Sequence, residues 1–152
     1  MSFNINEMFS VAGKTAIVTG GSRGIGKMIA QGFVENGVKT YITARKAEAC
    51  EATAAELSVG GVCIALPADI STTSGRNQFV EAIKQRESKI DILVNNAGAA
   101  WGASFEDYPD DGYDKVMDIN VRAVFMLTRD LLPLLTKDAS TENPSRVINI
   151  GS

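Results

Sequence analysis

The fold of this chain is decided by one stretch, Thr19-Gly20-Gly21-Ser22-Arg23-Gly24-Ile25-Gly26. A short β-branched run precedes it and a helical pattern follows it, so the stretch connects a strand to a helix. Glycine permits unusual turn conformations and lets a backbone lie close to a ligand. The free N–H groups and the dipole of the helix start favour a negatively charged ligand. The spacing of the glycines is G-x-x-x-G-x-G, and the turn is interpreted as the binding site for the diphosphate of a cofactor. The alternative interpretation is a tight connection between strand and helix with no ligand.

Short β-branched runs alternate with longer helical patterns along the chain, which is typical of a parallel α/β sheet. Strands are expected at 15–19, 39–44, 62–66 and 90–95, and from 146 onward. Helices are expected at about 24–36, 46–58, 72–87 and 111–136. The nearly continuous apolar strands predict an α/β fold of the Rossmann type, a doubly wound parallel sheet with helices on both faces. Residues 1–152 are expected to form a single dinucleotide-binding domain.

Composition excludes several classes of function. The net charge is −3 and the cations are scattered, which argues against a nucleic-acid partner. There is no histidine, and Cys50 and Cys63 lack metal-ligand spacing, so we expect no metal site and two buried, reduced thiols. Residues 1–10 do not have the pattern of a secretory signal, and no apolar run approaches the roughly 20 residues of a membrane helix. A cytoplasmic location is the expectation.

The residues after the second expected strand bear on the choice of cofactor. An NAD-binding domain usually has Asp or Glu there to hold the ribose 2′-hydroxyl. This chain has Ala44-Arg45-Lys46 instead, and Arg23 adds a further cation in the glycine turn. Because arginine pairs well with phosphate, the pattern favours NADP over NAD. The alternative is that Arg45 and Lys46 are an exposed helix start, although cations at that end oppose the helix dipole.

Together these motifs resemble the short-chain dehydrogenase/reductase family over nearly the whole chain. The glycine turn is similar to the family's T-G-x-x-x-G-x-G element, and Asn95-Asn96-Ala97-Gly98 to its N-N-A-G element. The resemblance implies a sheet-stabilising role for the N-N-A-G element beside the cofactor, and a place near the adenine for Asp69 and Ile70. The expected cofactor-binding residues are Gly20, Ser22, Arg23, Gly24, Ile25, Gly26, Arg45, Asp69, Ile70, Asn96, Ala97 and Gly98.

The resemblance also implies two catalytic positions. Asn120 looks like the family's helix asparagine that anchors a proton-relay water, and Ser152 like the serine that orients the substrate carbonyl. Taken by itself, Asn120 could instead bond to a backbone carbonyl. It lies on an apolar stripe of the expected helix 111–136, formed by Tyr113, Met117, Val121, Val124, Thr128, Leu131 and Leu135.

The family's Tyr-x-x-x-Lys pair is not present in these residues. The sequence at residues 101–102 and 143–152 is most similar to that of NADPH-dependent β-ketoacyl reductases of the rhamnolipid-biosynthesis type. The chain is therefore expected to be the N-terminal part of an NADPH-dependent carbonyl reductase that acts on 3-oxoacyl thioesters, inactive by itself, with its C-terminal strands missing. The alternatives are a non-catalytic dinucleotide-binding module and a regulatory half-domain that pairs with a full-length partner.

Two further expectations concern assembly. The resemblance implies a homo-oligomer, either a dimer or a tetramer. The fifth strand would form a sheet edge on which Val147, Ile148 and Ile150 are uncovered.

Overall fold

The computed structural model describes residues 9–151, so the N-terminal segment 1–8 and Ser152 lie outside the described residues. Its centre is a five-stranded sheet in the order β3-β2-β1-β4-β5, and every pair of neighbours is parallel. The strands are β1 (Thr15–Thr19), β2 (Lys39–Thr43), β3 (Cys63–Ala65), β4 (Ile92–Asn95) and β5 (Arg146–Asn149). The predicted strands are confirmed, and most differ from their predicted ends by one or two residues.

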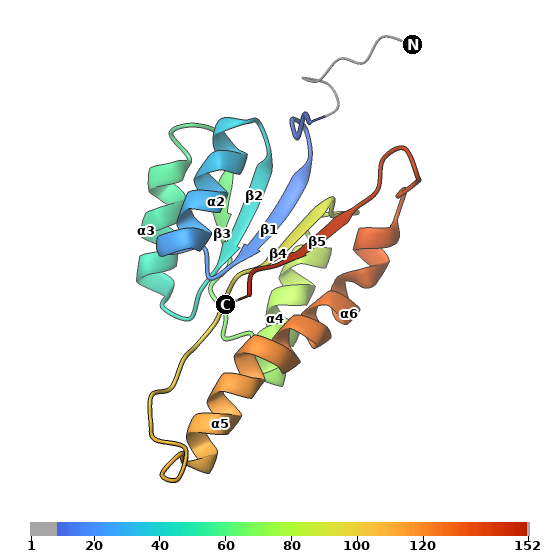
Figure 1. The fold of residues 1–152 in the computed structure, drawn as a ribbon. Coiled ribbons are helices and arrows are strands. Elements are labelled where there is room, and N and C mark those ends of the chain that lie inside the picture. The colour runs from blue at the N-terminus through green and yellow to red at the C-terminus, as the bar shows by residue number, and fades with distance from the viewer. Residues whose placement is uncertain (1–8, 152) are drawn as a thin grey trace.

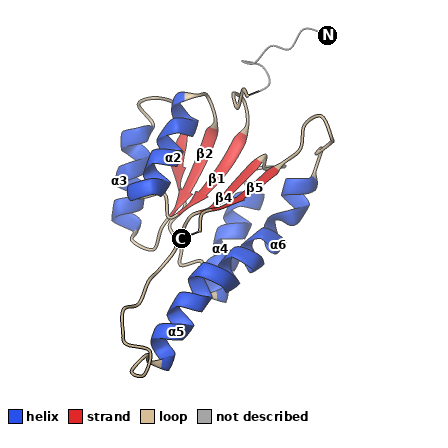
Figure 2. Cartoon of the chain, in the orientation of Figure 1, coloured by secondary structure: helices blue, strands red, loops and turns tan. Residues whose placement is uncertain are grey.

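Helices cover both faces of the sheet, as the doubly wound fold requires (Figures 1 and 2). On one face lie α2 (Gly24–Glu35) and α3 (Ala47–Leu57). On the other lie α4 (Thr73–Lys84) and α6 (Ala123–Thr136). A further helix, α5 (Asp110–Met117), continues the line of α6 beyond the sheet (Figure 1). The predicted fold class is confirmed.

The strands divide the core into two clusters because successive side chains point to opposite faces. Ala16 and Val18 of β1 pack towards α2 and α3, whereas Ile17 between them packs towards α4 and α6. Cys50 and Cys63 lie buried in the first cluster, as predicted. Burial raises the pKa of each thiol from 9.0 to about 11.

The predicted helix 111–136 is present, but a π-helical segment, η1 (Asp118–Arg122), interrupts it between α5 and α6. The residues of α6 that face the core are Ala123, Leu127, Leu131 and Leu135. Tyr113 and Val121 of the predicted stripe are instead more than half exposed. The π turn accounts for Tyr113, because it contains more residues than an α turn and shifts the phase of the positions before it. Val121 lies within the π turn and lines an open groove with Val124 and Thr128.

The outer edge of the sheet is β5, whose four residues are all exposed. Val147, Ile148 and Ile150 are 41–44% exposed, which confirms the prediction that they are uncovered. Within residues 9–151, no helix has the length and apolar character needed to cross a membrane.

Candidate dinucleotide site at the glycine turn

The glycine turn (residues 19–26) follows the carboxyl end of β1, at the centre of the sheet. From β1 the chain winds outwards through β2 to β3, and then crosses back to β4 on the other side of β1. In open α/β sheets, ligands bind where the strand order reverses in this way, outside the carboxyl ends of the strands. The topology therefore places the glycine turn at the expected position for a ligand.

The four glycines of the turn serve two different purposes. Gly20 and Gly24 have φ angles of +68° and +53°, a region that favours glycine. Gly21 and Gly26 are needed for close packing. A Cβ on Gly21 would lie 2.6 Å from Ile42 Cγ2, and one on Gly26 would collide with the carbonyl oxygen of Gly20. The turn is thus a narrow backbone cradle that side chains would fill.

Backbone and side-chain hydrogen bonds hold the cradle in place. The N–H groups of Gly20 and Gly21 donate to the carbonyl oxygen of Thr43 at the end of β2, at 2.8 and 3.2 Å. The Thr19 hydroxyl accepts from the backbone N–H groups of Asn96 and Ala97, both at 2.9 Å. The Asn96 Nδ2 in turn donates to the carbonyl oxygen of Thr19 at 3.0 Å. These bonds lock the ends of β1, β2 and β4 together beneath the turn.

The first asparagine of the N-N-A-G element, Asn95, connects β4 to the edge strand β5 by a side-chain hydrogen bond. Asn95 is buried, and its Nδ2 donates to Asn149 Oδ1 of β5 at 2.9 Å and to Thr128 Oγ1 of α6 at 3.3 Å. The contacts of Asn95 and Asn96 agree with a sheet-stabilising role for this element.

The start of α2 is suited to an anion. Its N-cap residue, Arg23, makes no capping hydrogen bond with its side chain, and no acidic residue lies in the first turn. The N–H groups of that turn therefore have no competing side-chain acceptor. Ile25 follows with its side chain 60% exposed, away from the core.

Three exposed cations belong to the turn or to the strand end bonded to it: Arg23 lies within the turn, and Arg45 and Lys46 follow β2, whose last residue, Thr43, accepts from Gly20 and Gly21. None of the three forms an ion pair with any residue in the described range 9–151. Lys46 is also the N-cap residue of α3. Unpaired cations beside an anion-binding backbone fit a ligand that carries an additional phosphate.

Asp69 and Ile70 lie at the end of the connection from β3 to α4. The Asp69 Oδ1 accepts from the N–H of Ser71 at 3.1 Å and from the Ser71 hydroxyl at 2.6 Å, so the carboxylate is held in one orientation. The Ile70 side chain is buried in the second core cluster. Ile70 can therefore contact a ligand only through its backbone.

Asn120 lies in η1 and is exposed, yet both of its polar atoms are bonded. Its Oδ1 accepts from the N–H of Ala99 at 3.0 Å, and its Nδ2 donates to the Ala99 carbonyl oxygen at 2.8 Å. Asn120 thus makes the backbone bond considered from the sequence, with a residue just beyond the N-N-A-G element. The structure brings it close to Gly98, whose added Cβ would lie 3.1 Å from Asn120 Oδ1.

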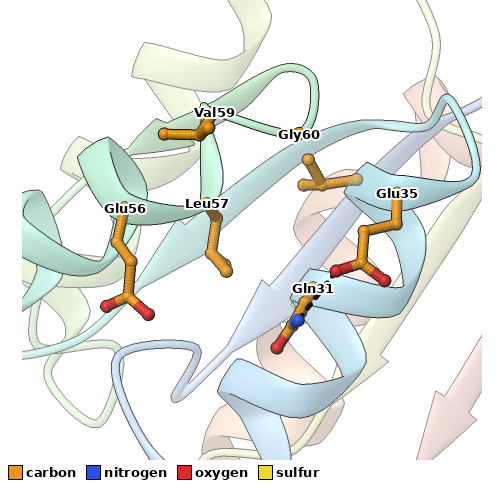
Figure 3. Close-up of a pocket in the computed structure, with 7 residues that line it drawn as sticks. Gln31, Glu35, Glu56, Leu57, Val59 and Gly60 are labelled. Carbon is orange, nitrogen blue, oxygen red and sulfur yellow. Dashed lines mark hydrogen bonds between the residues drawn. The ribbon is translucent and has the colours of Figure 1, made fainter.

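Outside the glycine turn, the described residues form a groove and a smaller hollow. An open, mainly apolar groove of about 550 Å³ runs along α6 and β5. Its lining residues are Asn120, Val121, Val124, Phe125, Thr128, Arg129, Leu132, Val147 and Asn149. A smaller hollow of about 260 Å³ lies between the carboxyl ends of α2 and α3, where Gln31 and Glu35 face Glu56 and Leu57 (Figure 3). The second hollow lies at the far end of α2 from the turn and is not part of the candidate site.

Sequence reasoning did not single out the threonines that support the turn. The Thr19 hydroxyl accepts the two hydrogen bonds from Asn96 and Ala97 described above. On α3, the Thr53 Oγ1 donates to the carbonyl oxygen of Ser22 at 3.0 Å. A β-branched residue is unusual in so alanine-rich a helix, and this was the available signal for Thr53.

Comparison with known families gives one match that covers most of the chain. The family model described as short chain dehydrogenase matches residues 14–152. Among curated proteins, the rhamnolipids biosynthesis 3-oxoacyl-[acyl-carrier-protein] reductase of Pseudomonas aeruginosa is 56% identical over 144 residues, which are 95% of this chain and 56% of the relative. The chain therefore spans about half the length of the curated relatives that it matches.

Solved structures agree with this match. The Pseudomonas aeruginosa RhlG/NADP active-site complex superposes with a TM-score of 0.91 at 55% identity, over 95% of this chain and 57% of that one. A metagenomic short-chain oxidoreductase in complex with NADP gives a TM-score of 0.85 at 30% identity, over 94% of this chain and 64% of that one. The sheet and its helices are thus shared with two proteins whose structures contain NADP.

Proposed function

Because this chain belongs to the short chain dehydrogenase family, we propose that it binds NADP at the glycine turn as the N-terminal part of an NADP-dependent carbonyl reductase. One observation carries the cofactor assignment: Arg23, Arg45 and Lys46 have no ion-pair partner among the described residues, beside a backbone cradle that suits a diphosphate. The two similar structures that contain NADP support it.

Each part of the site has a separate task in this proposal. The backbone from Gly20 to Gly26, with Ser22 and Ile25, receives the diphosphate at the start of α2. Arg23, Arg45 and Lys46 receive the 2′-phosphate of the adenosine. Asp69 and the backbone of Ile70 lie towards the adenine, and Asn96, Ala97 and Gly98 flank the cofactor on the β4 side. When bound, NADPH supplies the hydride for reduction of a carbonyl.

We propose a 3-oxoacyl thioester as the substrate of the whole protein. The printed name of the Pseudomonas relative at 56% identity supports this choice. Ser152 would orient the substrate carbonyl. The carboxamide of Asn120 is already bonded to Ala99, so its first task would be to position the loop after β4. An amide retains one further N–H and one further lone pair, which could hold a water molecule.

The 152-residue polypeptide itself is proposed to bind cofactor without turnover, because its sequence contains no Tyr-x-x-x-Lys pair. A general acid contributes roughly 10²–10⁴-fold to such reactions. A half-domain that pairs with a full-length partner is a second candidate, favoured by the apolar groove along α6 and β5. A homo-oligomer and a cytoplasmic location remain expectations.

Titration calorimetry of the 152-residue chain with NADPH and NADH tests the cofactor assignment. We expect NADPH to bind more tightly, and Arg45→Ala to weaken NADPH binding by about 10- to 100-fold, the effect of one hydrogen-bonded charge. Arg86→Ala, at an exposed arginine just beyond α4, is the matched control and should leave binding unchanged. Absence of binding by folded wild-type chain to either cofactor would overturn the proposal.

A further inference from the structure

We infer that Thr53 is a positioning residue for cofactor selection, because its hydroxyl fixes the glycine turn to α3. The turn carries Arg23, and the start of α3 follows Arg45 and Lys46. Thr53 would therefore hold the two cation-bearing segments in one arrangement. This inference rests on the proposed binding of NADP.

The contact itself is well defined. Thr53 lies on the inner side of α3 and is 6% exposed. Its Oγ1 donates to the carbonyl oxygen of Ser22 at 3.0 Å, across 31 positions of sequence. The bond is part-buried, and a carbonyl that loses its partner in such a place keeps part of its desolvation cost.

The direction of this bond departs from what a helical threonine usually does. A threonine inside a helix commonly returns its hydroxyl to the carbonyl four residues earlier. Thr128 and Thr136 of α6 do so, with Val124 and Leu132 at 2.7 and 2.9 Å. Thr53 instead reaches out of its helix to the turn, so this bond joins separate elements and does not serve α3 itself.

Fixing Ser22 affects the site directly. The peptide unit between Ser22 and Arg23 is planar, so a restrained Ser22 carbonyl also restrains the direction of the Arg23 N–H. Arg23 is the N-cap residue of α2. Further along, Lys27 and Glu56 join α2 to α3 at 2.7 Å, but both side chains are partly exposed, and exposed ion pairs contribute little.

A specific effect on affinity follows from this arrangement. A 2′-phosphorylated ligand must meet the turn and the start of α3 at the same time. A dinucleotide without the 2′-phosphate, such as NADH, owes its affinity mainly to contacts with the turn. Loss of the Thr53 bond should therefore weaken NADPH more than NADH, whereas a general loss of structure would weaken both equally.

The test compares Thr53→Val with Thr40→Val by calorimetric titration of the 152-residue chain with both cofactors. Thr40 is a matched control: it is fully buried, and its hydroxyl also donates to a backbone carbonyl, that of Val38, at 3.1 Å. We expect Thr53→Val to lower the ratio of NADPH to NADH affinity by about 3- to 10-fold, as for one lost hydrogen bond. Thr40→Val and Thr53→Ser should keep the wild-type ratio.

A double variant strengthens the test. If Thr53 acts by aligning the cations, Thr53→Val should change the ratio of NADPH to NADH affinity less when Arg45→Ala is already present. An unchanged ratio in Thr53→Val alone, or an equal loss for both cofactors, would overturn the inference while leaving the proposed function intact. Folded wild-type chain that binds neither cofactor would instead defeat the proposed function. If Thr53→Val does not fold, the ratio of NADPH to NADH affinity is compared between Thr53→Ala and Thr53→Ser. A wild-type ratio in both variants would contradict the inference.

Discussion

Asn120 and Ala99 are joined by two hydrogen bonds, of 3.0 and 2.8 Å, between the carboxamide of one and the backbone of the other. A side-chain amide thus pairs with a loop residue in the way that neighbouring strands pair. The loop that follows β4 is held to η1 at this point, directly beyond the N-N-A-G element. The asparagine therefore has a structural task that does not require a bound substrate.

Asn120→Ala should lower the free energy of unfolding by about 1 kcal/mol, because two exposed hydrogen bonds are lost and alanine recovers part of that loss through its helix propensity. Urea unfolding and amide exchange at Ala99 measure the effect. Asn77→Ala is the control, at an exposed helical asparagine with no side-chain hydrogen bond among the described residues. Unchanged protection of the Ala99 amide in Asn120→Ala would contradict the prediction.

Gly26→Ala should destabilise the chain by about 1–3 kcal/mol and weaken NADPH binding, because the added methyl group collides with the Gly20 carbonyl and the Asn96 amide. Gly32→Ala provides the comparison in the same helix. No atom of another element lies within 4 Å of the methyl group there, so we expect the free energy of unfolding to rise by about 0.5–1 kcal/mol. Thermal unfolding and calorimetric titration would check both variants; equal stability of the two would refute the packing argument.

Thr43→Val should be neutral or stabilising by up to about 1 kcal/mol. The Thr43 Oγ1 is buried without a hydrogen-bond partner among the described residues, and removing an unsatisfied hydroxyl relieves its desolvation cost. Thr40→Val removes a satisfied hydroxyl in the same strand and should cost about 1 kcal/mol. Urea midpoints would compare them. A loss in Thr43→Val as large as in Thr40→Val would mean that the Thr43 hydroxyl has a partner in solution.

Cys50 and Cys63 should react slowly with a thiol reagent at pH 8. Burial raises the pKa of each from 9.0 to about 11, so the thiolate fraction falls by about 100-fold relative to the unfolded chain. Reaction in urea gives the reference rate. Native thiols that reacted at the urea rate would show that the first core cluster opens readily.

The same shifts give stability a definite dependence on alkaline pH. Between about pH 9 and 11 the unfolded thiols lose their protons while the folded thiols retain them, so the free energy of unfolding falls as the pH rises through this range. Below pH 9 the contribution is fully present. The double variant Cys50→Ala and Cys63→Ala should have a shallower slope in urea titrations across this window. A slope as steep as that of the wild type would exclude the thiols as its cause.

Much of the fold could be predicted because its signals are local. The β-branched run at β1 and the glycines after it specify a strand and a turn by their own conformational limits. The placement of helices on both faces of the sheet followed from right-handed crossovers. Buried Cys50 and Cys63, and the uncovered side chains of β5, also followed from composition and sequence position.

Other features depend on contacts between distant residues, which one sequence does not reveal. The bond from Thr53 to Ser22 exists only because α3 packs beside the turn. The glycine pattern also does not say which glycine serves which purpose: Gly24 has the left-handed φ, and Gly21 makes the close approach to Ile42. The π turn at η1 could not be predicted from apolar spacing, since its residues read equally well as α-helix.

The π turn also limits how the length of this helix can vary. Removing one residue from η1 would allow a regular α-helix, but α5 would then rotate by about 100° about its axis relative to α6. Trp101 packs against the backbone at Gly112 of α5, and Lys115 lies over the Trp101 ring with its Nζ 5.0 Å from the centroid. A one-codon deletion at this solvent-facing position would therefore carry both partners of Trp101 away from it, and related sequences should vary by substitution here more readily than by gaps.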